Sequence, residues 1–308
     1  MNSKTKLIAI VGPTASGKTS LSVEVARAIG GEIICCDSMQ IYKEMNIGTA
    51  KPSEEEKCGI PHHLFDFVDP EHDFSCAEYR PLAEETVKDI VGRGGVPVFC
   101  GGTGLYLDSL LRGGELSPSV PDGIRQELEK RSPDSLWEEL LTLDPDAAAL
   151  THKNNVKRVV RALEIYYGTG KTKTEWDILS RQTPSPYEPL IIALDYKSRD
   201  VLYERIDRRV DIMLEAGLLD EVVSLRDRMG RTASQAIGYK ELINYLDGNC
   251  SYSEAVGELK KSTRNYAKRQ LTYFRRMKNA LWFYPDAESG EKIFENIVNI
   301  AKEHLNIP

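Results

Sequence analysis

The residues best suited to chemistry lie near the N-terminus, where residues 12–19 read GPTASGKT. The spacing Gly-x-x-x-x-Gly-Lys-Thr predicts a phosphate-binding loop, because glycines let successive N–H groups point at an anion and the following helix adds its positive dipole end. We expect Lys18 to neutralise phosphate oxygens and the Thr19 hydroxyl to ligate Mg²⁺. The predicted diphosphate- or nucleotide-binding residues are Gly12, Pro13, Thr14, Ala15, Ser16, Gly17, Lys18 and Thr19.

Asp37 is the second candidate, because it closes an apolar run at residues 32–37. The carboxyl ends of parallel strands face the ligand crevice, so this carboxylate either supports the metal or acts as a general base. A motor or switch NTPase would add an acid at the end of another strand, but the run at residues 96–101 continues into GGTGLY. The Gly/Thr-rich turns at residues 48–52 and 101–106 are expected at the same crevice, with the Thr103 hydroxyl in the second.

Positive charge is concentrated in two places although the formal net charge of the chain is −7. Residues 260–278 hold eight Lys or Arg and no Asp or Glu, with Tyr266, Tyr273 and Phe274 among them. A second cluster consists of Lys153, Lys157, Arg158 and Arg161. Basic side chains beside aromatic ones suit a nucleic-acid backbone and unstacked bases, whereas either cluster alone also fits a solvated helix face.

The elements that must position these residues alternate between strand and helix in the first third of the chain. Short apolar runs at residues 6–11, 32–37, 96–101 and 189–195 are typical of buried parallel strands, and helical periodicity follows at 19–29 and 78–91. Between Pro118 and Pro186 only helical periodicity remains, and after Asp195 the chain is expected to be helical almost to its end. We therefore predict an α/β fold, a P-loop NTPase-like parallel sheet core flanked by helices (residues 1–117 and 188–308), with an all-helical insertion domain at 118–187.

Composition predicts a cytoplasmic protein that does not span a membrane. No apolar run approaches the length of a transmembrane helix, and the N-terminal residues lead directly into the phosphate loop rather than into a cleavage site. None of the six cysteines forms a Cys-x-x-Cys pair, so free thiols are expected. One alternative is a metal site built from Cys58, His62, His63, His72 and Cys76, although these spacings match no common zinc pattern. A monomer is the expected state.

Eight motifs together resemble the tRNA dimethylallyltransferases, also called tRNA isopentenyltransferases. In chain order they are GPTASGKT, DSMQIY, GTAKP, PHHLFD, GGTGLY, RALEIYYGTGK, QAIGYKEL and TRNYAKRQLTYFRR. The resemblance runs from about residue 6 to residue 276. Two departures lie on the RNA side: Tyr273 stands where the family usually has Trp, and HKNN replaces the usual Pro-Asn-Asp before RALEIYY.

The resemblance implies transfer of a dimethylallyl group from dimethylallyl diphosphate to the exocyclic N6 amine of the adenosine 3′ of the anticodon in tRNA. Asp37 would be the general base, and the loop with Lys18, Mg²⁺ on Thr19 and one arginine would hold the diphosphate. Arg205 and Arg209 are both catalytic candidates for that arginine. The contacts to the tRNA anticodon stem-loop carry over to Asp37, Ser38, Met39, Gln40, Thr103, Lys157, Arg158, Val159, Val160, Arg161, Gln235, Gly238 and Tyr239, with Arg125 as a further candidate.

Three other functions remain open from the sequence. A small-molecule kinase could use ATP at the same loop, and a nucleotide-dependent binding module could use it without catalysis. Prenyl transfer to free adenine nucleotides would use the same donor site, but the helical insertion and the basic clusters favour an RNA acceptor.

Overall fold

The computed structural model describes residues 4–118 and 120–308, which fold into two compact units. The first combines Met1–Asp108 with Tyr187–Pro308, and the second is Ser109–Pro186. The second unit begins inside helix α4 (Gly104–Leu111), ahead of residue 118, where the proline-rich joint placed the expected insertion.

The first unit is built on a six-stranded sheet in the order β3-β2-β4-β1-β5-β6, with every neighbouring pair parallel. The strands are β1 (Thr5–Val11), β2 (Gly31–Cys35), β3 (His62–His63), β4 (Val96–Gly101), β5 (Tyr187–Leu194) and β6 (Ala280–Phe283). The predicted parallel sheet flanked by helices is therefore confirmed. The edge strands β3 and β6 were not predicted, because two and four residues are too few to show a strand period.

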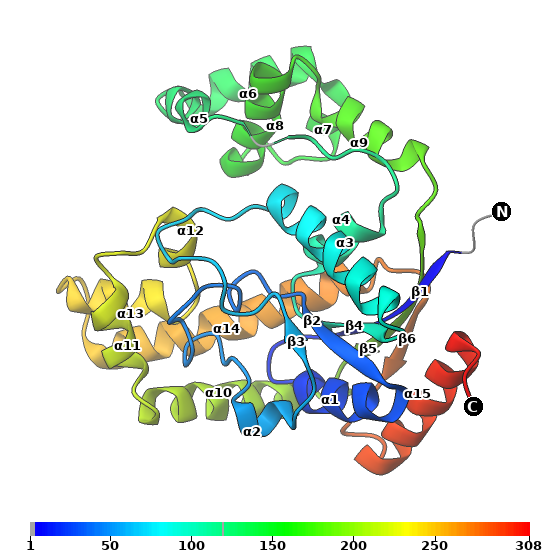
Figure 1. Cartoon of the computed structure of the whole chain (residues 1–308). Coiled ribbons are helices and arrows are strands. Elements are labelled where there is room, and N and C mark those ends of the chain that lie inside the picture. The colour runs from blue at the N-terminus through cyan, green and yellow to red at the C-terminus, as the bar shows by residue number, and fades with distance from the viewer. Residues whose placement is uncertain (1–3, 119) are drawn as a thin grey trace. The chain divides into compact units, whose positions relative to one another are not determined.

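Two helices cover one face of this sheet and lie side by side in Figure 1. They are α1 (Lys18–Ile29) and α15 (Gly290–Leu305). Alternate residues of the central strand, Ile8 and Ile10, pack with Val25 of α1 and Ile297 of α15, all fully buried. This packing fixes the start of α1 at the carboxyl end of β1, where the phosphate loop lies.

Further helices of the first unit lie around the sheet and around the loops at the carboxyl ends of its strands. They are α2 (Glu54–Lys57), α3 (Cys76–Gly92), α10 (Arg199–Glu215), α11 (Leu218–Leu225), α12 (Arg231–Ser234), α13 (Tyr239–Leu246) and α14 (Tyr252–Phe274). A second apolar core joins α11, α13 and α14 to the segment after β2 through Ile41, Tyr42, Met45, Leu218 and Leu259. The long helix α14 also packs on α10 through Ala267 and Leu271.

The second unit is all helical. It contains α5 (Asp122–Glu129), α6 (Pro133–Leu143), α7 (Pro145–Ala149), α8 (Val156–Thr169) and α9 (Lys173–Gln182). Its core is formed by residues of α5 to α8 such as Leu136, Leu140 and Leu163. Buried Asp144 fastens two of its helices, because its carboxylate accepts hydrogen bonds from the Ala147 N–H of α7 and from the N–H and hydroxyl of Thr174 on α9.

Over residues 4–118 and 120–308, the structure contains no helix with the length and apolar character that crossing a membrane requires.

Candidate functional site

The loop after β1 has the backbone geometry of an anion cradle. Gly17 caps α1 with a left-handed φ of 87°, and no side chain caps the free N–H groups of the helix. Gly12 lies so close to β5 that an added Cβ would stand 3.0 Å from the Leu194 carbonyl oxygen. The loop therefore requires glycine at both positions, and it leaves N–H groups and a helix dipole open to a phosphate.

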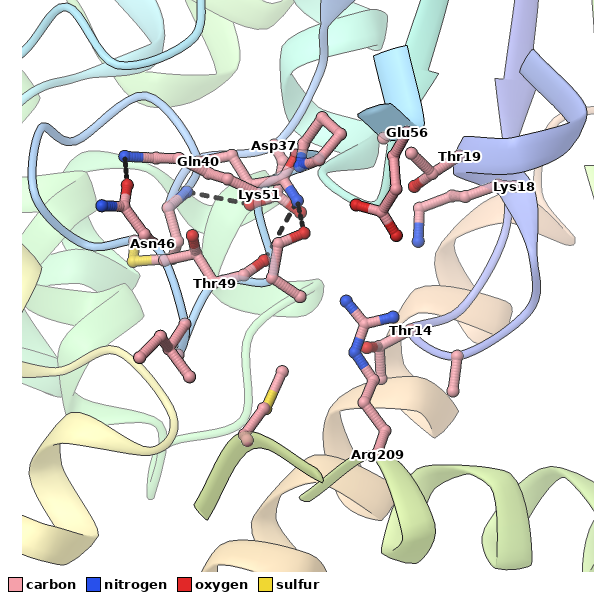
Figure 2. Close-up of a pocket in the computed structure, with 18 of the residues that line it drawn as sticks. Thr14, Lys18, Thr19, Asp37, Gln40, Asn46, Thr49, Lys51, Glu56 and Arg209 are labelled. Atoms are coloured by element: carbon pink, nitrogen blue, oxygen red, sulfur yellow. Dashed lines mark hydrogen bonds between the residues drawn. The ribbon is translucent and has the colours of Figure 1, made fainter. Parts of the chain in front are cut away.

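Two cationic side chains converge on the space in front of this loop. In Figure 2 the Lys18 ammonium and the Arg209 guanidinium point toward the same part of the cavity. Burial lowers the pKa of both groups. The charge of Arg209 lowers the pKa of Lys18 further, and the charge of Arg205 lowers the pKa of Arg209. Lys18 Nζ donates to the Pro13 carbonyl oxygen at 3.2 Å, whereas the buried Arg209 Nε has no hydrogen-bond partner within the described residues. Binding of an anion at such a site is favourable, because it supplies partners for buried charges and for an unpaired donor.

The two candidate arginines on α10 have different surroundings. Both line the cavity, but Arg205 Nε donates to the Ala15 carbonyl oxygen at 3.0 Å, so this side chain already braces the phosphate loop. The buried Nε of Arg209, one helical turn further along, has no hydrogen-bond partner in the described part of the chain. The structure therefore distinguishes the two arginines where the sequence left both open.

Asp37 faces the same cavity, which has a volume of about 1570 Å³ and lies within the first unit. One carboxylate oxygen, Oδ1, accepts a hydrogen bond from the Met39 N–H at 2.9 Å. The other, Oδ2, accepts none from the part of the chain that the structure describes. Ser38 is fixed beside it, since Thr103 Oγ1 accepts from the Ser38 N–H at 2.9 Å. A carboxylate held by one oxygen and open at the other can accept a proton from a bound nucleophile.

A loop at residues 45–51 forms another wall of the cavity and is held by a residue that the sequence did not indicate. The Glu221 carboxylate of α11 accepts hydrogen bonds from the N–H groups of Asn46, Ile47 and Gly48 at 2.8, 2.8 and 3.0 Å, and from the Tyr239 hydroxyl at 2.5 Å. Within the sequence, Glu221 is one of many exposed-face glutamates on a helix, so no local pattern singles it out.

The QAIGYKEL motif packs against this loop through Tyr239. Tyr239 is fully buried, and its ring packs so tightly on Gly48 that an added Cβ would come within 2.5 Å of it. Gly238 starts α13 with a left-handed φ of 100°. The prediction that Tyr239 contacts RNA is therefore wrong for its side chain, because no surface of it is accessible. Gln235 does line the cavity.

The predicted RNA contacts in the second unit divide into core and surface residues. Val159 and Val160 are each 1% exposed in the apolar core, so their side chains are not accessible for the predicted contact with RNA. Arg161 and Arg125 lie 3.0 and 3.7 Å from the buried carboxylate of Glu164 and balance its charge. The remaining predicted residues of this cluster, Lys157 and Arg158, are exposed and form no ion pair with any described residue.

Helix α14 has less free positive charge than the sequence indicated. Arg264 pairs with Asp207 at 2.5 Å and Lys260 with Asp211 at 2.6 Å, both acids belonging to α10. Tyr266 of the same helix lines the cavity, and burial raises the pKa of its hydroxyl. The basic segment is therefore partly an internal ion-pair surface.

The alternative cysteine and histidine metal site does not assemble. His63 Nε2 bonds to Glu32 at 2.6 Å and His72 Nε2 to Glu78 at 2.7 Å. Across the described ranges, no group of three or more His, Cys, Asp or Glu side chains is arranged to hold a metal ion.

A Mg²⁺ ion nevertheless fits beside the phosphate loop. The Thr19 hydroxyl faces the cavity, with the Glu56 carboxylate across from it (Figure 2). Mg²⁺ keeps several waters and takes a few hard oxygen ligands together with substrate phosphates, so one hydroxyl at a diphosphate site is a suitable donor set.

Comparison with known proteins gives a consistent result over nearly the whole chain. A family model described as IPP transferase matches residues 40–277, and one described as isopentenyl transferase matches residues 5–63. The tRNA dimethylallyltransferase of Halalkalibacterium halodurans is 48% identical, with 95% of each chain covered. That of Geobacillus thermodenitrificans is 47% identical, with 98% of this chain and 99% of the relative covered.

Solved structures agree. The tRNA isopentenylpyrophosphate transferase of Bacillus halodurans matches with a TM-score of 0.74 at 44% identity, covering 98% of this chain and 97% of that one. A eukaryotic dimethylallyltransferase, solved in snapshots of its action on tRNA, matches with a TM-score of 0.82 at 30% identity, covering 99% of this chain and 80% of that one. The resemblance drawn from the eight motifs is confirmed, and the chain belongs to the tRNA dimethylallyltransferase family.

Proposed function

We propose that this transferase moves a dimethylallyl group from dimethylallyl diphosphate to the N6 amine of the adenosine 3′ of the anticodon in tRNA, and releases diphosphate. The observation that carries the proposal is that one cavity is lined by the groups needed for both substrates. The phosphate loop with Lys18 and Arg209 suits the diphosphate, and the Asp37 carboxylate suits the amine. A phosphoryl transfer would need the cradle but not a base for an amine.

The leaving group is a diphosphate anion whose charge grows as the allylic C–O bond breaks. Loop N–H groups, Lys18 and Arg209 surround the place where that charge develops, and fixed donors of this kind stabilise the transition state more than the ground state. Bound on Thr19 and the phosphates, Mg²⁺ would supply further charge neutralisation. We assign the diphosphate contact to Arg209 rather than Arg205, since Arg205 is engaged with the loop backbone.

The acceptor side is built around Asp37. Its Oδ2 would take the proton that the N6 amine loses as the new C–N bond forms, while the bond from Met39 N–H holds Oδ1 in place. The adenosine must leave its stack to enter the cavity, as bases do in enzymes that act on them. Ser38 and Thr103 stand next to Asp37 to receive it, and an aromatic amine, being a weak nucleophile, depends mainly on this positioning.

The surface residues Lys157 and Arg158, together with Gln235 and Gln40 at the cavity, are the proposed contacts to the tRNA anticodon stem-loop. Action on tRNA in the cytoplasm, as a monomer, is part of the same proposal.

One experiment tests donor, acceptor and base together. Wild type and Asp37→Asn are incubated with labelled dimethylallyl diphosphate, Mg²⁺ and unmodified tRNA, with AMP offered separately as a rival acceptor. We expect transfer to tRNA alone, and a loss of at least about 100-fold in rate for Asp37→Asn with tRNA binding retained. Transfer to AMP would redirect the assignment to free nucleotides. Turnover of ATP without prenylation of RNA would refute it.

A further inference from the structure

One buried side chain joins the two halves of the site. Gln270 projects from the C-terminal part of α14 and is 4% exposed. Its amide oxygen accepts a hydrogen bond from the Thr14 N–H in the phosphate loop at 2.9 Å. Its amide nitrogen donates to the Gly102 carbonyl oxygen, in the turn after β4, at 3.1 Å.

The turn that Gln270 holds is the one that supports the base. An added Cβ on Gly102 would stand 2.0 Å from Gln270 Nε2 and 3.7 Å from Asp37 Oδ2, so Gly102 is packed between the two side chains. The next residue, Thr103, donates its N–H to the Cys36 carbonyl oxygen at 3.0 Å and holds Ser38 through its hydroxyl. A displacement of Gly102 is therefore transmitted to the backbone on both sides of Asp37.

Gln270 fits this place because an amide offers one acceptor and one donor on a short, rigid fork. Both bonds are made to backbone groups of loops that begin at the ends of different strands, β1 and β4. The Gln270 amide therefore links the two loops directly through these two hydrogen bonds. It can do so without touching either substrate.

We propose that Gln270 is a positioning residue that sets the distance between the departing diphosphate and the proton acceptor Asp37. The inference rests on the proposed function and adds a role for α14 beyond its basic surface. Reacting atoms must lie about 3–3.5 Å apart, and a misplacement of about 1 Å costs on the order of 100-fold in rate. The two hydrogen bonds of this amide fix the phosphate loop relative to the turn that supports Asp37.

The first test is Gln270→Met, which keeps the length of the side chain and removes both hydrogen bonds. The matched control is Ile297→Val, a mild change at a fully buried position in α15 that is not among the residues lining the cavity. We measure the single-turnover rate at saturating tRNA and dimethylallyl diphosphate, the KM of each substrate, and the thermal midpoint. Gln270→Met should lower the single-turnover rate by about 30- to 100-fold with both KM values changed less than about 3-fold.

A second variant keeps the test valid if Gln270→Met folds poorly. Gln270→Glu preserves shape and the acceptor for Thr14 N–H, but its ionised form repels the Gly102 carbonyl oxygen. Protonated, it can donate to that oxygen as the amide does. The rate of Gln270→Glu relative to wild type should therefore rise as the pH falls from 8 to 6, a signature that a residue needed only for stability would not give.

The outcomes separate two failures. If wild type itself transfers no dimethylallyl group to tRNA, the proposed function is at fault. If wild type is active but Gln270→Met matches Ile297→Val in rate, or the relative rate of Gln270→Glu does not change with pH, Gln270 does not position the site.

Discussion

Glu221→Gln is the sharpest test of how the cavity wall is held. The four donors divide evenly between the oxygens: the Asn46 and Ile47 N–H groups point at Oε2, while the Gly48 N–H and the Tyr239 hydroxyl point at Oε1. The substitution keeps the shape, removes the charge and replaces one oxygen by an NH₂ group. An NH₂ group cannot accept a hydrogen bond from a backbone N–H.

The least costly arrangement places the new NH₂ at the Oε1 position. The Tyr239 hydroxyl can then rotate to accept, and only the Gly48 N–H loses its partner. One unsatisfied donor costs about 1–3 kcal/mol, and the bonds to the remaining oxygen lose their charge assistance. Because Glu221 is only half-buried and water can reach part of the loop, we expect a total near the lower end, about 2 kcal/mol.

Hydrogen exchange is the direct assay. We expect the amides of residues 46–48 to exchange about 30-fold faster in Glu221→Gln, which corresponds to about 2 kcal/mol, and KM for tRNA or the prenyl donor to rise as the wall loosens. Tyr239→Phe removes one donor and leaves the carboxylate satisfied, so it should have a smaller effect. Glu258→Gln, an exposed change on α14, is the control. Unchanged exchange at residues 46–48 in Glu221→Gln would refute the reasoning.

Three further predictions concern the cationic groups. Arg209→Gln should lower the single-turnover rate by about 100-fold, measured against the exposed control Lys88→Gln; equal rates would remove Arg209 from the diphosphate site. Burial lowers the pKa of free Lys18 and a bound anion raises it again, so binding takes up a proton at high pH. Calorimetry should therefore show that the binding of dimethylallyl S-thiolodiphosphate weakens as the pH rises toward the ordinary lysine pKa of 10.5. A binding constant that does not change with pH would contradict this. Changing Lys157 and Arg158 together to Gln should reduce the slope of log K for tRNA against log salt by about 2, whereas an unchanged slope would place both outside the RNA interface.

Expectations that depended on short stretches of chain agree well with the structure. Residues 12–19 form a loop between β1 and α1, and Asp37 follows β2 at the cavity. Both follow from local rules, since glycine spacing sets the backbone path and the end of a parallel strand sets the position of the next residue. The RNA contacts expected at residues 157–161 were carried over from the resemblance as one continuous stretch. That stretch therefore included the buried Val159 and Val160 together with the exposed Lys157 and Arg158.

By itself, then, the sequence determined the parallel α/β core, the phosphate loop, the candidate base and the family. Only the tertiary structure decided that the Nε of Arg205 is bonded to the phosphate loop whereas that of Arg209 is buried without a partner among the described residues. It also decided that Glu221 holds the loop at residues 46–48 and that Gln270 joins the two halves of the site. The physical reason is distance along the chain: Gln270 and Thr14 are 256 residues apart, and Glu221 and Ile47 are 174 apart. Hydrogen bonds between such residues depend on how α10, α11 and α14 pack around the cavity, and no local spacing records that packing.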